Sequence, residues 1–281
     1  MHMDHFPPLW TKSAEAVGLW QRLRSAPRSL LMLDYDGTLA PFHEDRFKAL
    51  AYAGVEDRLA ILSGLAQIHL VLVTGRPARE LRALLPPSTR IDIWGSHGRE
   101  QLKSDGAYKL FALDSVQQAT LQHVAREMAA LGFPETLELK PSSLAVHWRS
   151  CEPEVQEQIR SRIQSVFDGL DEPGRLHLLP FDGGLELRSN DRTKGTAVRQ
   201  IMALEPTGLP VAYLGDDLTD EDAFAAMGNR GLSILVRGEV RRSCARFWLR
   251  PPEELLHFLD EWIAASQSQP AAATSSAEAP L

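Results

Sequence analysis

Residues 30–38 read LLMLDYDGT, and this stretch decides which fold the chain can adopt. Its four leading apolar residues predict a short strand that is buried on both faces, as in a parallel sheet. Two carboxylates, Asp34 and Asp36, follow at once, and Gly37 lets the backbone turn behind them. In open α/β sheets, ligands bind outside the carboxyl ends of the strands. The two aspartates therefore stand where a binding site is expected.

Further apolar runs predict more strands of the same sheet. They lie at residues 68–73, 91–94, 211–214 and 232–236. Apolar residues at helical spacing predict helices between and after these strands, at residues 55–65, 77–85 and 255–263. Strands that alternate with helices are typical of a parallel sheet covered on both faces. We expect an α/β fold with a Rossmann-like, doubly wound parallel sheet as its core.

Residues 109–189 differ from this pattern and predict an inserted unit. Two helical patterns, the second opened by Pro153, combine with four short segments that alternate like strands of a half-exposed sheet. The parallel core resumes near Lys194. The expected organisation is a core of residues 1–108 and 190–264, an inserted α+β domain of residues 109–189, and a disordered tail of residues 265–281.

The composition narrows the classes of function. The chain has 281 residues and a formal net charge of −7, so binding to nucleic acid or to anionic membranes is not expected. Two cysteines without a CxxC pair exclude a disulfide framework and a cysteine zinc site. No apolar run approaches the roughly 20 residues of a membrane-spanning helix, and the first residues lack a signal-peptide pattern. We expect a cytoplasmic protein, with a monomer favoured, that acts on a small molecule.

A parallel sheet would bring several polar side chains to one edge. Besides the two aspartates after the first strand, these are Thr74, Asp216, Asp217 and Lys194, the last at the start of a helix. Carboxylates so close together repel one another. A divalent cation such as Mg²⁺, which prefers oxygen ligands and commonly binds substrate phosphates, would relieve the repulsion. The set therefore predicts a magnesium-dependent phosphoryl-transfer site.

In such a site Asp34 would attack phosphorus as the nucleophile and form an aspartyl phosphate. Asp36 would protonate the leaving oxygen and then activate water as a base. Thr74 would donate a hydrogen bond to a phosphoryl oxygen, and Lys194 with Mg²⁺ would offset the charge on these oxygens. Each residue alone has a simpler explanation, such as a helix cap for Thr74. Their occurrence together, in order and at strand ends, favours catalysis.

Four motifs mark these positions: DYDGT at 34–38, VTGR at 73–76, Lys194-Gly195, and GDDLTDEDAF at 215–224. In this set, which spans the core, the chain resembles the haloacid dehalogenase superfamily of aspartate-nucleophile phosphatases. Further segments make it similar to the trehalose-6-phosphate phosphatases within that superfamily: GSHG at 95–98, KPSSLAVHWR at 140–149 and LELR at 185–188. The resemblance implies Mg²⁺-dependent hydrolysis of trehalose 6-phosphate, with residues 109–189 as a cap that closes over the sugar.

The resemblance also implies roles for individual residues. Asp34 and Asp216 would ligate Mg²⁺, and Asp36 would offer its backbone carbonyl. Asp217 and Asp220 would ligate through water or orient their neighbours. The sugar would contact Arg76, His97 and Gly98 from the core and Lys140, His147, Arg149 and Glu186 from the cap. Such polar side chains can form hydrogen bonds with the hydroxyl groups of a disaccharide. The alternative for Lys140, His147 and Arg149, which lie on alternating strands, is an ordinary solvated face.

Two departures from the family pattern bear on substrate preference. His147-Trp148-Arg149 stands where an HYR-like segment is expected, and SNDRTKG at 189–195 lacks an expected proline. The same catalytic residues would serve sibling phosphatases that act on sucrose 6-phosphate, a glycosyl-3-phosphoglycerate or glucosylglycerol phosphate. A receiver-like signalling module, a phosphomutase and a sugar-phosphate sensor are further alternatives. Asp36 and the cap argue against a receiver, which needs neither a second carboxylate as acid/base nor a cap.

Overall fold

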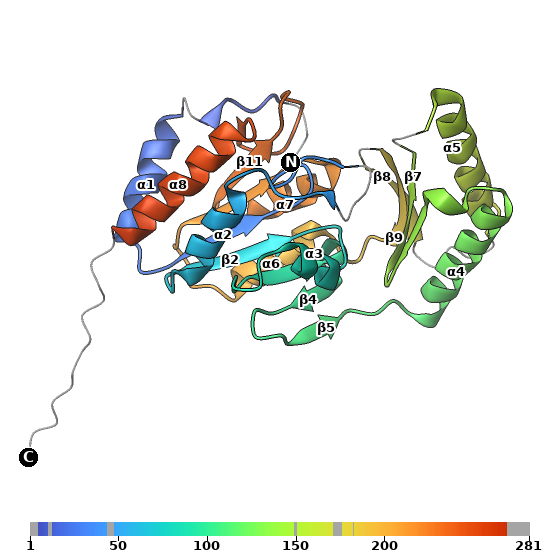
Figure 1. Ribbon diagram of the computed structural model, residues 1–281, viewed down its shortest axis with the longest axis horizontal. Coiled ribbons are helices and arrows are strands. Elements are labelled where there is room, and N and C mark those ends of the chain that lie inside the picture. The colour runs from blue at the N-terminus through green and yellow to red at the C-terminus, as the bar shows by residue number, and fades with distance from the viewer. Residues whose placement is uncertain are drawn as a thin grey trace, which may run out of the picture.

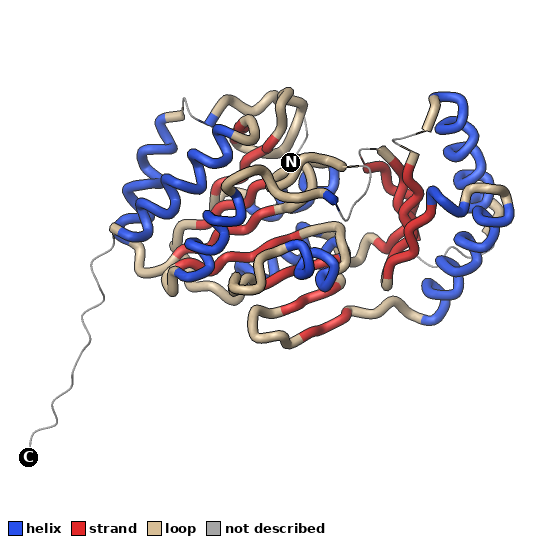
Figure 2. Tube along the Cα trace, in the orientation of Figure 1, coloured by secondary structure: helices blue, strands red, loops and turns tan. Residues whose placement is uncertain are grey.

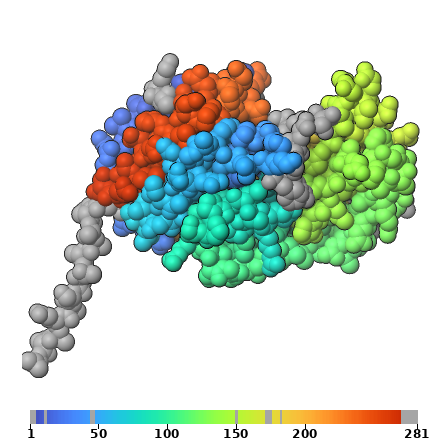
Figure 3. Space-filling model, viewed as in Figure 1, coloured from blue at the N-terminus to red at the C-terminus, as the bar shows by residue number. Residues whose placement is uncertain are grey.

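The computed structural model describes residues 5–10, 13–43, 48–148, 151–170, 176–181 and 183–268. Within these residues the chain forms an eight-stranded, mostly parallel sheet and a separate four-stranded antiparallel sheet. Figures 1 and 2 show the two sheets in neighbouring bodies, each with its own helices. In the space-filling view the smaller body is a lobe beside the core (Figure 3). The predicted fold class, an α/β core with an inserted α+β domain, is confirmed.

The large sheet is built around strand β1, Ser29–Leu33, whose five residues are all buried. β1 pairs in parallel with a strand on each side, and Leu31 is opposite both Leu70 and Ala212. The order of the sheet is β12-β11-β10-β1-β2-β3-β4-β5. Its other strands are β2 Ile68–Val73, β3 Asp92–Gly95, β4 Glu100–Leu102, β5 Tyr108–Leu110, β10 Val211–Gly215, β11 Leu232–Val236 and β12 Phe247–Leu249.

Alternate side chains of β1 enter two hydrophobic cores, one on each face of the sheet. Leu31 and Leu33 pack into one core, and Leu30 and Met32 pack into the other. The helices over the first core are α1 Ala14–Ser25, α2 Val55–Gly64, α3 Ala78–Leu84 and α8 Glu253–Gln267, and those over the second are α6 Lys194–Ala203 and α7 Glu221–Met227 (Figure 1). Burial on both faces explains why these strands are unbroken apolar runs.

The cap is the inserted domain, a sheet with the order β6-β7-β9-β8. Its strands are β6 Leu137–Lys140, β7 Ser143–His147, β8 Leu176–Phe181 and β9 Gly184–Ser189, and its helices are α4 Ser115–Ala130 and α5 Pro153–Asp168. Leu144, Val146 and Leu187 pack against these helices. The opposite face of the sheet lies toward the core (Figure 1). Short 3₁₀ helices lie at η3 Ser96–Gly98, η4 Pro134–Thr136 and η5 Leu218–Asp220.

The structure places the domain boundaries a few residues from those expected. Strand β5 pairs with β4 in the core sheet, so the core continues to Leu110, past residue 108. The three residues of β5 are all exposed and too few to give a periodic signal. Helix α8 runs to Gln267, so the first residues of the expected tail are helical. Residues 269–281 lie outside the described part of the chain.

Phe258 tests how much the packing of α8 contributes to stability. Its side chain is 1% exposed, and its ring lies 5.4 Å from that of Trp20 and 5.8 Å from that of Trp262. Phe258→Ala should lower the free energy of unfolding by about 3–5 kcal/mol, because it leaves a cavity in a close-packed core. Urea unfolding measures the loss. Leu204→Ala, at a residue 76% exposed, should change it by less than about 0.5 kcal/mol; equal losses would contradict this packing.

Candidate active site

The carboxyl ends of the central strands bring several predicted site residues together. Asp34 follows β1, Thr74 follows β2 and Asp216 follows β10. All three are almost fully buried, as is Lys194, the first residue of α6. Parallel pairing of β1 with β2 and with β10 aligns these strand ends. The predicted convergence of polar groups at one edge is therefore present.

Gly37 lets the loop after β1 pack directly against the loop after β10. Its φ is +80°, a left-handed backbone that glycine adopts without strain. A Cβ at this position would lie 2.1 Å from Oδ2 of Asp216. The next residue, Thr38, donates a hydrogen bond to Oδ1 of Asp216 at 3.4 Å. The two loops thus fix each other, and the aspartates that follow β1 and β10 share one space.

Three carboxylates and one ammonium form the centre of the site. One oxygen from each of Asp34, Asp216 and Asp220 lies within 4.8 Å of the others. Lys194 Nζ lies 3.0 Å from Asp34 Oδ1 and 2.8 Å from Asp220 Oδ1. All four side chains are buried. The ammonium therefore has to offset more than one negative charge.

Burial and repulsion shift the protonation of this cluster. Burial, together with the charge of Asp220, raises the pKa of Asp34 to about 8, although Lys194 acts to lower it. Burial and the charges of Asp34 and Asp220 raise the pKa of Asp216 well above its usual value. Burial would lower the pKa of Lys194, but Asp220 and Asp34 outweigh it and raise that pKa. Without further positive charge, the cluster does not keep three ionised carboxylates at neutral pH.

The donor set fits a divalent cation such as Mg²⁺. Oδ2 of Asp216 is buried and accepts no hydrogen bond, while Oδ1 accepts one from Thr38. An unsatisfied buried carboxylate oxygen costs free energy, and a hard cation that prefers oxygen ligands would satisfy it. Asp34 and Asp216 would hold the ion, which would supply positive charge beside the oxygens of a bound phosphate.

Asp220 orients the groups around it. One of its oxygens accepts hydrogen bonds from Lys194 Nζ and Tyr213 Oη. The other accepts the backbone N–H groups of Asp216 and Asp217, at 3.1 and 3.0 Å. Both oxygens are thus engaged by protein donors. This arrangement matches the orienting role among the two that the resemblance implies for Asp220.

The carboxylates of Asp36 and Asp217 lie outside the three-carboxylate cluster. Arg76 binds both oxygens of Asp36, with Nε at 2.6 Å and Nη2 at 2.5 Å. Asp217 accepts the N–H of Leu218 at 2.7 Å and thereby caps η5. The backbone N–H of Arg76 also donates to Thr74 Oγ1 at 3.1 Å. Arg76 therefore connects the hydroxyl after β2 with the second carboxylate after β1.

Glu186 on β9 connects the cap to the core. Its carboxylate lies 2.9 Å from His97 Nε2 and accepts hydrogen bonds from Ser143 Oγ at 2.7 Å and Lys140 Nζ at 3.1 Å. Lys140 also donates to the carbonyl of Gly75 at 3.4 Å. A Cβ on Gly75 would lie 2.7 Å from the His97 ring. Since His97 and Gly75 belong to core turns after β3 and β2, the cap is docked over the strand ends.

The charges at this junction are set by burial and by neighbours. Burial disfavours the Glu186 carboxylate, but the hydrogen bond from His97 and the charges of Lys140 and Arg188 outweigh it and lower the Glu186 pKa well below its usual value. For His97, burial dominates and lowers the pKa to about 4, although Glu186 acts to raise it. His97 is therefore neutral at pH 7. Its Nδ1 is buried and has no hydrogen-bond partner.

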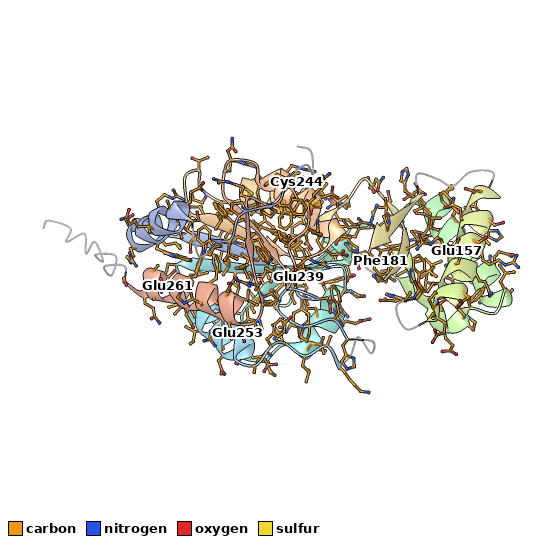
Figure 4. All side chains as sticks on the ribbon, turned by 90° about the horizontal axis from the view of Figure 1, so that it is seen from above. Glu157, Phe181, Glu239, Cys244, Glu253 and Glu261 are labelled. Atoms are coloured by element: carbon orange, nitrogen blue, oxygen red, sulfur yellow. The ribbon has the colours of Figure 1, made fainter. Side chains whose placement is uncertain are left out.

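The remaining residues that were predicted to contact the sugar are His147, Gly98 and Arg149. His147 is half exposed and lies 2.9 Å from Glu138. Its ring packs edge-on against Phe181, which Figure 4 shows on the side of the cap nearest the core. Gly98, with φ +95°, packs so closely that a Cβ would lie 2.8 Å from a backbone carbonyl at the start of α6. Arg149 lies outside the described residues.

Sequence reasoning missed several residues that support the site. They are Tyr213, Ser143, Arg237 and Arg241, which donate hydrogen bonds to Asp220, Glu186 and the backbone carbonyl of Asp216. Ser143 stands inside KPSSLAVHWR, so that motif carried a signal for it. The two arginines follow the last motif in a segment with several arginines. Nothing in that pattern distinguished the two that reach the site.

The buried His97 should make the stability of the docked structure depend on pH. Its pKa of about 4 is below the usual 6.5, so between these values the unfolded chain binds a proton that the folded chain does not. The free energy of unfolding should therefore fall as the pH falls through this window. His97→Gln should remove at most about 3 kcal/mol of this decrease. Urea unfolding at pH 7 and 4.5 measures it.

The exposed His257 provides the control for this experiment. His257→Gln should leave the decrease in stability at its wild-type size. A His97→Gln variant with a wild-type decrease would contradict the assignment of His97 as a buried, neutral group.

Comparison with known proteins identifies the family to which the chain belongs. The family model described as Trehalose-phosphatase matches residues 32–246. A trehalose-phosphate phosphatase from Mycobacterium marinum is 30% identical over 277 residues, which cover 92% of this chain and 66% of that protein. The chain thus spans a little less than two thirds of the length of that relative.

Solved structures show the same fold. The C-terminal domain of a trehalose-6-phosphate phosphatase from C. albicans superposes with a TM-score of 0.77 at 20% identity, covering 92% of this chain and 98% of that one. A phosphatase of the haloalkanoate (HAD) enzyme superfamily from Bacteroides thetaiotaomicron has a TM-score of 0.53 at 16% identity, covering 84% and 95%. Because the family model matches more than half of the chain, the chain belongs to the trehalose-phosphatase family.

Proposed function

We propose that the chain hydrolyses trehalose 6-phosphate to trehalose and inorganic phosphate, with Mg²⁺ and through an aspartyl phosphate on Asp34. The observation that supports this best is the buried cluster of Asp34, Lys194, Asp216 and Asp220 at the strand ends of a trehalose-phosphatase family member. A nucleophile, its counter-ion and cation ligands are the parts that phosphoryl transfer to a carboxylate requires. The name of the mycobacterial relative supports the choice of substrate.

In the first half of the reaction, an oxygen of Asp34 attacks phosphorus and the bond from phosphorus to the sugar oxygen breaks. Lys194, 3.0 Å from Asp34, orients the attacking carboxylate. Asp36 enters this step carrying the proton that it took from water in the preceding turnover and donates it to the departing oxygen, so the sugar leaves as an alcohol. Asp36 is free to turn toward the substrate once its pairing with Arg76 loosens. The incoming phosphate, itself an anion, competes for that guanidinium.

In the second half, Asp36 is a carboxylate and removes a proton from a water molecule. The water oxygen attacks phosphorus, the bond from phosphorus to Asp34 breaks, and inorganic phosphate leaves. Thr74 already accepts the N–H of Arg76, so its own hydroxyl proton remains for a phosphoryl oxygen. Lys194 offsets the negative charge that develops on these oxygens in both halves.

The cap is proposed to read the sugar. Lys140 and Glu186 lie on its core-facing side, next to His97 of the core, and Glu186 and His97 are buried at this junction. Sugar hydroxyls could replace contacts within this polar group, which gives a disaccharide more partners than a small phosphate ester would have. His147 and Arg149 of the cap, with Arg76 and Gly98 of the core, complete the proposed set.

We further propose that the chain is a cytoplasmic monomer that acts on a small molecule and binds neither nucleic acid nor membranes. The formal net charge of −7 supports the exclusion of polyanions. In the described ranges of the chain, no helix is both long and apolar enough to cross a bilayer.

A substrate panel tests the proposed reaction. Phosphate release with Mg²⁺ should be fastest from trehalose 6-phosphate, ahead of sucrose 6-phosphate, glucose 6-phosphate and a glycosyl-3-phosphoglycerate. Asp34→Asn should abolish release from all of them, because an amide cannot act as the nucleophile. EDTA should stop the reaction and added Mg²⁺ should restore it. Activity confined to another member would overturn the substrate, and activity that survives in Asp34→Asn would overturn the mechanism.

Glu186 tests whether the cap reads the sugar. Glu186→Gln keeps the size of the side chain but removes the charge that holds Lys140 and His97. It should lower kcat/KM for trehalose 6-phosphate at least about tenfold more than for p-nitrophenyl phosphate, which has no sugar to read. The exposed Glu135 of η4 is the control, since Glu135→Gln should change neither value. Equal losses on both substrates would assign Glu186 to the fold instead of the sugar.

A further inference from the structure

Glu221 belongs to the GDDLTDEDAF motif but has no part in the reaction proposed above. It is the first residue of α7, and it is 8% exposed. Its carboxylate accepts a hydrogen bond from Ser243 Oγ at 2.9 Å and from the backbone N–H of Cys244 at 2.6 Å. It also pairs with the guanidinium of Arg241. The buried carboxylate thus connects the motif to a segment before β12.

Arg241 links Glu221 to the loop that follows β10. Its Nη1 pairs with Glu221, and its Nη2 donates to the backbone carbonyl of Asp216 at 3.1 Å. Arg237 donates to the same carbonyl at 3.3 Å. Two guanidinium groups therefore converge on one peptide oxygen. Arg241 is held by a second carboxylate, that of Glu221, whereas Arg237 Nη1 lies 4.0 Å from Oδ2 of Asp216 itself.

These contacts complete the restraint of Asp216. Its N–H donates to Asp220 Oδ2 at 3.1 Å, its carbonyl accepts from the two arginines, and its Oδ1 accepts from Thr38. Its Oδ2 is buried and accepts no hydrogen bond. Arg237 Nη1 lies 4.0 Å from Oδ2, beyond hydrogen-bond distance. Each polar atom of Asp216 except Oδ2 is therefore held by a hydrogen bond with a protein group. A carboxylate fixed in this way loses little conformational entropy when it binds an ion.

We propose that Arg241, oriented by Glu221, is a positioning residue that fixes Asp216 for binding of a divalent cation. A guanidinium suits this task because its planar fork can serve the Glu221 carboxylate and the Asp216 carbonyl together. Partners that orient a metal ligand commonly change metal affinity about 10–100-fold when they are removed. The inference rests on the cation site of the proposed function, but it concerns binding of the metal alone.

The experiment measures the Kd of Mn²⁺ by calorimetry on the full chain, without substrate. Arg241→Met should weaken binding at least about tenfold, and Arg241→Lys should lie between it and the wild type, because a lysine can serve only one of the two partners well. The control is Arg242→Met. Arg242 is exposed and its side chain lies over Phe6. Its backbone carbonyl accepts a hydrogen bond from Arg241 Nη1 at 2.9 Å, a contact that the substitution keeps. The Kd of Arg242→Met should equal that of the wild type.

Thermal unfolding in EDTA separates positioning from a purely structural role. A structural role would lower the Tm of Arg241→Met without changing its Kd, and that result would overturn the proposal. An equal loss of affinity in Arg242→Met would overturn it too. Should Arg241→Met fail to fold, the Kd of Arg241→Lys decides in the same way. If the wild-type protein binds no Mn²⁺, both the cation site and this inference are wrong. If the substrate panel fails but the Kd values follow the predicted order, the inference stands and the proposed function is wrong.

Discussion

The Lys194 ammonium lies between two buried carboxylates, and the arrangement of the site depends on this contact. It is 3.0 Å from Asp34 and 2.8 Å from Asp220. The three residues come from the loop after β1, the start of α6 and the loop after β10, so one charged group connects segments far apart in the sequence. Removing one partner of such a buried set leaves an uncompensated charge, which is strongly destabilising. Asp216 lies in the same cluster, where Arg237 Nη1 is 4.0 Å from its Oδ2 and makes no hydrogen bond to it. A bound cation would offset the negative charge that Lys194 alone does not balance.

Buried polar atoms without a hydrogen-bond partner lie both in the carboxylate cluster and at the junction of cap and core. Buried polar atoms in proteins are normally satisfied, so those that are not call for an explanation. Asp216 Oδ2 lies in the carboxylate cluster, whereas His97 Nδ1 and two nitrogens of Arg188 lie around Glu186 at the junction of cap and core. A cation at the first place and a sugar at the second would satisfy them. The core would then carry the chemistry and the cap the choice of substrate.

The sequence predicted the parallel core because burial on both faces makes each central strand an unbroken apolar run with a polar end. The same logic placed Asp34, Thr74 and Asp216 at one edge. It missed α1, whose buried residues are Leu19 and Leu23, and the β4–β5 hairpin, whose strands have three residues each. Pairs such as Arg76–Asp36 and Arg241–Glu221 could not be predicted, because they join long side chains on separate loops whose directions only the folded backbone fixes. For the same reason the GDDLTDEDAF motif predicted Asp220 as a site residue but could not predict the hydrogen bonds that it makes.

The covalent step on Asp34 is the central claim, and the Asp36→Asn variant tests it most directly. With p-nitrophenyl phosphate the leaving group needs no acid, so the first step should still occur, whereas hydrolysis of the aspartyl phosphate lacks its base. Stopped-flow absorbance should show a burst of nitrophenol equivalent to one per enzyme molecule, and mass spectrometry of the quenched protein should find the phosphoryl group on Asp34. Steady turnover without a burst, and without a modified Asp34, would contradict the covalent mechanism.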